Sequence, residues 1–221
     1  MREHQAKHRQ LAKERSKIER RKAKRLEHGT ALLVCEGRRT EPHYLRELLR
    51  LLEISPARVE IIEGQTNADA MSVVRRARQL YERKPEYDRV FIIIDAEQAN
   101  LQKALADCNQ PIQRASIKKG IQEIHIRPIV TTPCFEYWLL LHFRYTDQPF
   151  ISYADVLTEL LVFLPDYKKV DPYIFDKVGG EEGLRRAVTN SAISKRELAR
   201  TGATYPDTDM PILLEALETI R

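Results

Sequence analysis

The sequence is poor in the features that mark secreted, thiolate-metal or membrane proteins. Its three cysteines, Cys35, Cys108 and Cys134, are odd in number and too far apart for a Cys-x-x-Cys pair. This spacing argues against a disulfide framework or a thiolate zinc site and favours a reducing compartment. No stretch approaches the ~18 to 20 apolar residues of a membrane span, and the charged first residues lack the apolar run of a signal peptide. We therefore expect a cytoplasmic protein without membrane contact.

Two common catalytic motifs are also missing. The chain has no Gly-x-x-x-x-Gly-Lys-Ser/Thr loop, so ATP hydrolysis by that route is not expected. His43, His125 and His142 do not form a His-Glu-x-x-His site. No spacing pairs Cys134 with a particular histidine, so we interpret this cysteine as a buried small hydrophobe.

The positive charge of the chain is concentrated at its N-terminal end. Residues 1–28 hold eleven Lys or Arg against four Asp or Glu, a balance of +7, whereas the remaining residues have a balance of −2. This segment has high helix propensity, but its only large apolar residues are Leu11, Ile18 and Leu26, too few to build a core. Two interpretations stay open. The segment is either a solvated helix or disordered leader, or a basic arm that binds nucleic-acid phosphates.

Strand and helix patterns alternate through the first part of the remaining chain. Apolar runs predict buried strands at residues 30–35, 58–62, 90–94 and 121–130. Apolar stripes at helical spacing follow the first three strands, at residues 40–52, 70–81 and 101–108. Thr40 is a plausible N-cap of the first helix, and Pro128 indicates that the fourth strand is an edge strand or ends early. Successive β-then-α units predict a parallel sheet with helices on both faces, joined by right-handed crossovers.

Beyond residue 133 the pattern is helical. Helices are predicted at residues 134–145, 153–164, 182–200 and 209–221, with joints at Gly179-Gly180 and near Tyr205-Pro206. The sequence contains no internal repeat and no low-complexity linker. We therefore predict an α/β protein with a basic arm at 1–28, an α/β core at 29–145 and a helical C-terminal extension at 146–221 packed on that core.

Acidic residues close two of the predicted strands. Glu36 ends the first strand, and Asp95 and Glu97 end the third. In a parallel sheet these ends meet at one edge, where alternate residues project to the same side and ligands gather. Such a cluster suits Mg²⁺ or Mn²⁺ and the chemistry of phosphoryl transfer. The alternative is that these acids are ordinary turn or helix-cap residues.

Other residues near the same edge are weaker candidates. Glu41, in the first turn of the following helix, is either a capping charge favoured by the helix dipole or a metal ligand. Glu136 opens the helix after the fourth strand and could be a second metal ligand or the base that orients water. Candidates for binding substrate phosphate are Arg38, Arg39, Lys168 and Lys169, with a solvated surface as the alternative.

These motifs carry a family resemblance. A glutamate and glycine closing one strand and an Asp-x-Asp-like pair closing a later one resemble the Toprim domain of topoisomerases, primases and overcoming-lysogenization-defect nucleases. The chain resembles the RloB family more closely, from about residue 30 to the C-terminus. The matching motifs are C-E-G-x-x-T-E-P-x-Y (35–44), the acidic pair (95 and 97), P-C-F-E-x-W-L-L-L-H-F (133–143) and P-x-T (206–208).

The resemblance implies a Toprim-like fold and a Mg²⁺- or Mn²⁺-dependent endonuclease that cuts RNA, such as tRNA, or DNA in bacterial phage defence. It also implies an ATPase partner encoded nearby. Glu36, Asp95 and Glu97 match the Toprim acidic positions, and Glu41 and Glu136 match the other acids of the family. Because Glu97 stands where aspartate is usual, a second hypothesis is a catalytically weak or inactive Toprim-like subunit that binds nucleic acid or signals with an ATPase partner. An oligomer is compatible with either hypothesis.

Overall fold

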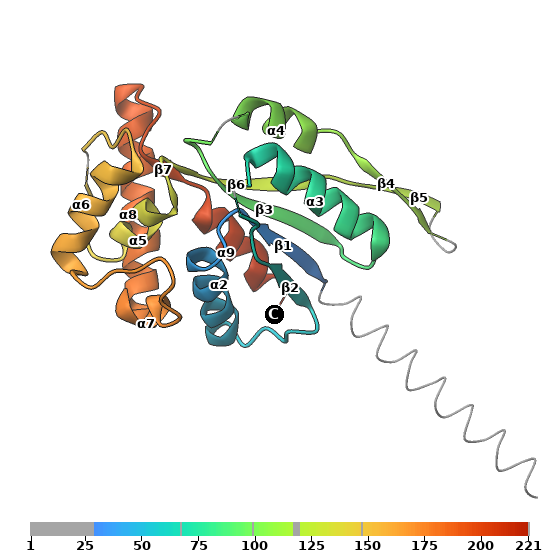
Figure 1. The fold of residues 1–221 in the computed structure, drawn as a ribbon, viewed down its shortest axis with the longest axis horizontal. Coiled ribbons are helices and arrows are strands. Elements are labelled where there is room, and N and C mark those ends of the chain that lie inside the picture. The colour runs from blue at the N-terminus through green and yellow to red at the C-terminus, as the bar shows by residue number, and fades with distance from the viewer. Residues whose placement is uncertain (1–28, 67, 99, 117–119, 147, 221) are drawn as a thin grey trace, which may run out of the picture.

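A five-stranded sheet lies at the centre of the molecule (Figure 1). The computed structural model describes residues 29–66, 68–98, 100–116, 120–146 and 148–220, so the predicted arm at 1–28 lies outside the described residues. The strand order is β2-β1-β3-β6-β7. The strands are β1 (Ala31–Cys35), β2 (Val59–Ile62), β3 (Arg89–Asp95), β6 (Ile126–Thr132) and β7 (Asp207–Thr208). All neighbours are parallel except β6 and β7, which confirms the predicted α/β class with a mostly parallel sheet.

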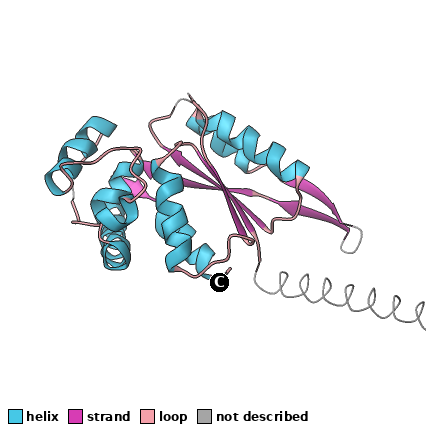
Figure 2. Ribbon diagram, turned by 60° about the horizontal axis from the view of Figure 1, so that its bottom comes forward, coloured by secondary structure: helices cyan, strands magenta, loops and turns pink. Residues whose placement is uncertain are grey.

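Helices cover both faces of this sheet, as Figures 1 and 2 show. One face packs against α2 (Thr40–Leu51), α5 (Phe135–Leu141) and α9 (Met210–Glu218), and the other against α3 (Ala70–Arg83) and α4 (Leu101–Cys108). Alternate side chains of β1 enter the two cores: Leu33 and Cys35 contribute to the first, and Leu32 and Val34 to the second. The central strands are uniformly apolar because both of their faces are buried.

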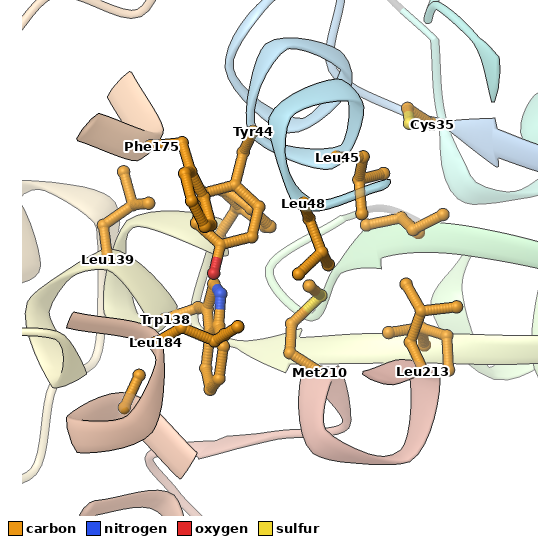
Figure 3. Packing of buried hydrophobic residues seen from close by; sticks show 14 of the residues in the cluster. Cys35, Tyr44, Leu45, Leu48, Trp138, Leu139, Phe175, Leu184, Met210 and Leu213 are labelled. Carbon is orange, nitrogen blue, oxygen red and sulfur yellow. The ribbon is translucent and has the colours of Figure 1, made fainter. Parts of the chain in front are cut away.

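Three further helices lie beside the carboxyl end of the sheet, where Figure 1 shows them grouped around α5. They are α6 (Tyr153–Phe163), α7 (Ile174–Lys177) and α8 (Gly180–Thr201). The first core continues into them: Tyr44 of α2 lies edge-on to Trp138 of α5 at 6.4 Å and to Phe175 of α7 at 5.1 Å (Figure 3). Residues on both sides of position 145 therefore share one core. None of the described helices is long and apolar enough to span a membrane.

The prediction of a single strand at residues 121–130 is wrong. The segment is divided between β5 (Gly120–Ile124) and β6, and β5 pairs in an antiparallel ribbon with β4 (Ile112–Ser116). Pro128 lies in β6, before the two residues that pair with β7, so its outward side has no neighbouring strand. The Val130 N–H points outward to Asp209, and the Pro128 nitrogen, two residues earlier, points the same way. Its missing N–H therefore breaks no ladder bond, as expected at an edge.

Smaller differences concern the ends of elements. Arg39 is the N-cap residue of α2, whereas Thr40 is its first helical residue and donates its hydroxyl to the Lys169 carbonyl at 2.8 Å. Helix α8 begins at Gly180, two residues before the predicted start, while α5 and α9 end earlier than predicted. The joint at Gly179 and Gly180 is confirmed, because both have positive φ. Helix α7 and strand β7 were not predicted, because they are too short for their apolar residues to show a helical or strand periodicity.

Candidate functional site

The carboxyl ends of β1 and β3 open onto a pocket of about 550 Å³, which we call the acidic pocket. Its wall contains all five predicted carboxylates. The lining residues are Glu36, Gly37, Arg38, Arg39, Thr40, Glu41, Asp95, Glu97, Gln98, Phe135, Glu136, Lys169 and Val170. Larger pockets lie at the amino end of β3 and along α2, but neither contains a buried carboxylate. The acidic pocket is therefore the candidate site.

Glu36 and Asp95 connect the two central strands at the pocket. Glu36 follows the last residue of β1, and its N–H still donates to the carbonyl of Ile93 in β3 at 2.9 Å. The Glu36 carboxylate accepts a hydrogen bond from the Asp95 N–H at 3.1 Å. The Asp95 carboxylate in turn accepts the N–H of Phe135, the first residue of α5, at 2.8 Å. The two acids thereby join β1, β3 and α5 at one wall.

Two glycines allow the backbone to pass closely beside these acids. The Glu41 carboxylate accepts the Gly37 N–H at 3.1 Å, and a Cβ on Gly37 would lie 1.8 Å from a Glu41 oxygen. Gly64, in the loop after β2, donates its N–H to the Gly37 carbonyl at 2.9 Å. A Cβ on Gly64 would lie 1.6 Å from the Glu36 carbonyl oxygen. The role of Gly64 was not predicted, since its only signal in the sequence is a glycine in a turn.

Glu136 and Lys169 form an ion pair in the lining of the pocket. Glu136 is only 2% exposed, and its carboxylate accepts the Tyr167 hydroxyl at 2.7 Å. The Lys169 ammonium lies 3.3 Å from the same carboxylate oxygen and 3.9 Å from the centre of the Tyr153 ring. The two tyrosines were not predicted, because they come from α6 and the loop after it. Lys168 is exposed and does not line the pocket.

Glu97 and the two arginines lie at the rim. The exposed Glu97 carboxylate accepts the N–H of Tyr153, the first residue of α6, at 3.3 Å. Arg38 donates to the Thr66 hydroxyl at 3.1 Å, and Arg39 is exposed beside it. The rim thus combines one exposed acid with two cationic side chains.

The family model for RloB-like proteins matches residues 31–217. The chain belongs to the RloB-like protein family. The matched range contains every residue that lines the acidic pocket and all the described strands and helices except the last residue of α9. Comparisons with curated proteins and with solved structures found no match for this RloB-like protein.

Three acids of the RloB-like pocket, Glu36, Glu41 and Asp95, have raised pKa values. Burial, opposed by the Asp95 N–H and reinforced by the charge of Glu41, raises the pKa of Glu36 to about 7. Burial, reinforced by the charge of Glu136, raises the pKa of Glu41 to about 7. Burial also raises the pKa of Asp95 well above its ordinary value, with further contributions from the charges of Glu41 and Glu36. Such a concentration of shifted groups in one pocket is typical of functional sites.

The donor set fits a hard divalent cation. Glu36, Asp95 and Glu97 supply carboxylate oxygens, the ligands that Mg²⁺ and Mn²⁺ prefer. A bound cation would favour the ionised forms of Glu36 and Asp95, which burial and neighbouring negative charges disfavour. Among the described residues, no three His, Cys, Asp or Glu side chains are already arranged as a metal-binding group. All five carboxylates of the pocket already accept hydrogen bonds from protein groups. Binding a cation would therefore require local side-chain movement.

Proposed function

We propose that this RloB-like protein is a metal-dependent nuclease that hydrolyses phosphodiesters in RNA or DNA at the acidic pocket. The observation that carries the proposal is the convergence of Glu36, Glu41 and Asp95, three acids with raised pKa values, beside Lys169. Acids that repel one another in the folded protein favour a divalent cation, and a lysine beside them favours a phosphate. This combination is suited to a charged phosphodiester substrate.

The residues of the pocket divide into three proposed roles. Glu36, Asp95 and Glu97 would hold Mg²⁺ or Mn²⁺, which when bound neutralises phosphate charge and lowers the pKa of water. Glu41, with a pKa of about 7, is suited to accept the proton of an attacking water near neutral pH, and Glu136 would orient that water.

Basic residues would bind the substrate. Lys169 would neutralise charge on the reacting phosphate from within the pocket, while Arg38 and Arg39 at the rim would bind flanking phosphates. The basic segment 1–28 would add sequence-independent affinity that weakens with salt. The family resemblance extends the proposal to a Toprim-like nuclease of phage defence, in the cytoplasm, that works with an ATPase.

The proposal is tested by incubating the purified chain with tRNA, single-stranded DNA and duplex DNA in Mg²⁺ or Mn²⁺. Glu36→Gln and Asp95→Asn remove a charge but keep the size of each side chain, and both should abolish cleavage. Glu82→Gln, an exposed glutamate of α3, is the matched control and should cleave normally. Cleavage that survives both pocket substitutions would exclude this site as the catalytic centre.

A second function is a subunit that binds nucleic acid and signals to an ATPase partner without turnover. The hydrogen bonds that the pocket carboxylates accept favour it, because each of the five is already engaged by a protein group. It predicts nucleic-acid binding without cleavage, both for the isolated chain and after co-expression with the ATPase. A nuclease that requires its partner would instead cleave only in the co-expressed complex.

A further inference from the structure

A second cavity, of about 530 Å³, lies beside α3, and we call it the α3 groove. Its charged lining residues are all arginines: Arg75, Arg76 and Arg83. The other residues of the lining, among them Gln65 and Gln79, are uncharged. Helix α3 covers the face of the sheet opposite α2 and α9 (Figure 1). The α3 groove is therefore a cationic cavity distinct from the acidic pocket.

The arginines of the α3 groove lack the carboxylate partners that other arginines of the fold have. Arg78, on the same helix, pairs with Asp107 at 3.1 Å, and Arg46 of α2 pairs with Glu63 at 2.7 Å. Within the described part of the chain, no carboxylate forms an ion pair with an arginine of the α3 groove. Cations that share a groove without counter-ions favour an anionic ligand.

The loop after β2 separates the α3 groove from the acidic pocket. On one side, the Arg76 guanidinium donates to the Glu63 carbonyl at 2.5 Å. On the other, the Gly64 N–H donates to the Gly37 carbonyl at 2.9 Å. Gly37 lines the acidic pocket, whereas Gln65, the residue after Gly64, lines the α3 groove. The two cavities are therefore neighbours, and the same short loop contributes to the walls of both.

Arg38 extends the positive charge from one cavity toward the other. Its side chain lines the acidic pocket and donates to the Thr66 hydroxyl, in the loop after β2, at 3.1 Å. From Arg76 to Arg83 the α3 groove then follows the helix for roughly 10 Å, the axial length that about three phosphates of one strand occupy. A strand that leaves the acidic pocket past Arg38 would meet a further row of cations along α3.

We propose that the α3 groove binds the backbone of a nucleic-acid strand beside the phosphodiester that enters the acidic pocket. Guanidinium groups form paired hydrogen bonds with phosphate oxygens, and the amides of Gln65 and Gln79 add further donors. Contacts to phosphates position a strand without reading its bases, so the binding would not depend on base sequence. The identity of this ligand rests on the proposed function, because a phosphodiester in the acidic pocket brings its neighbouring phosphates to the loop after β2.

Binding of labelled single-stranded RNA and DNA to the full chain in EDTA tests the proposal in the absence of cleavage. Arg75→Gln combined with Arg83→Gln removes two charges at exposed positions. For the probe that the wild type binds more tightly, this variant should raise Kd by about tenfold or more. The slope of log Kd against log salt should fall by about 1.4, since each phosphate neutralised on a single strand contributes about 0.7.

The matched control is Arg196→Gln combined with Arg200→Gln, which removes the same charge from two exposed positions of α8. It should leave the affinity and the slope unchanged, and the basic segment 1–28 is present in both variants. A wild type that binds neither probe would overturn the proposal. So would an unchanged Kd in the α3 variant, or an equal loss in the α8 variant.

Photo-cross-linking locates the bound strand. Gln79→Cys places a thiol for a cross-linking reagent in the α3 groove, and the native cysteines are buried. The labelled protein should cross-link to the oligonucleotide, whereas Thr189→Cys, at an exposed position of α8, should not. Equal yields from the two positions, or competition by polyglutamate as strong as by unlabelled oligonucleotide, would overturn the assignment to nucleic acid. A chain that binds through the α3 groove but never cleaves would support this proposal and refute the nuclease.

Discussion

The Glu36 carboxylate accepts the backbone N–H of Asp95 at 3.1 Å, although the two residues are 59 positions apart in the chain. This hydrogen bond joins the ends of adjacent parallel strands and holds two acids at one wall of the acidic pocket. Burial is the main cause of the raised pKa values of Glu36 and Asp95, and the charge of Glu41 raises both further. The acids should therefore oppose folding at neutral pH and favour cation binding.

Glu41→Gln should stabilise the cation-free protein at neutral pH. Burial raises the pKa of Glu41 from its ordinary 4.5 to about 7, so the folded protein keeps a proton that the unfolded chain loses between these values. Stability therefore falls as pH rises through this window, by up to about 3 kcal/mol for this residue. Glutamine keeps an acceptor for the Gly37 N–H without ionising.

The measurement is chemical unfolding in EDTA. The stabilising effect of Glu41→Gln should be largest above pH 7 and vanish near pH 4.5. Glu82→Gln, an exposed position on α3, provides the comparison and should change stability little at either pH. A Glu41→Gln protein that is less stable than the wild type at pH 8 would show that the charged carboxylate stabilises the fold.

Mn²⁺ should raise the melting temperature more at pH 8 than at pH 6. A cation held by Glu36, Asp95 and Glu97 must displace the protons of Glu36 and Asp95, whose pKa values are raised, so its apparent affinity increases with pH. At a free concentration of about 100 Kd the stabilisation would be about 2.7 kcal/mol. Differential scanning calorimetry measures the change in melting temperature on adding Mn²⁺, with Asp95→Asn as the comparison. An equal change at both pH values, or in both proteins, would argue against the site.

Lys169→Ala and Lys168→Ala should behave differently although the residues are adjacent. Both side chains are exposed, but the Lys169 ammonium lies 3.3 Å from the buried Glu136 carboxylate and lines the acidic pocket, whereas Lys168 does not line it. We expect Lys169→Ala to lower kcat/KM for nucleic-acid cleavage by about tenfold or more, equivalent to about 1.4 kcal/mol, because a phosphate contact and the counter-ion of Glu136 are lost. Lys168→Ala should stay within about twofold of the wild type.

Gly64→Ala should weaken Mn²⁺ binding, because its new Cβ would lie 1.6 Å from the Glu36 carbonyl oxygen and push the loop or β1 aside. Gly180→Ala is the contrasting variant: its Cβ meets nothing within 4 Å, although its positive φ is unfavourable for alanine by about 1 kcal/mol. Calorimetric titration with Mn²⁺ should show a weaker Kd for Gly64→Ala alone. Equal affinities in the two folded variants would falsify the positioning role of Gly64.

Much of the fold could be predicted because its elements have clear local patterns. The apolar run at 90–94 indicated a strand with two buried faces, and the stripe at 70–81 indicated the inner face of α3. The division between β5 and β6 could not be predicted, since apolar residues continue across His125 and no turn residue marks the break. Local periodicity shows how a segment is buried, but not which neighbour it pairs with.

The sequence by itself determined that acids follow the strands ending at Cys35 and Asp95, since parallel strands bring such ends to one edge. Only the tertiary structure decided which side chains enclose them. Lys169 and Tyr167 reach Glu136 from a loop more than thirty residues away, and Gly64 reaches Glu36 by backbone contact. These contacts depend on how the helices pack against the sheet, which no local pattern records. Burial, and with it the raised pKa values, arises from the same packing.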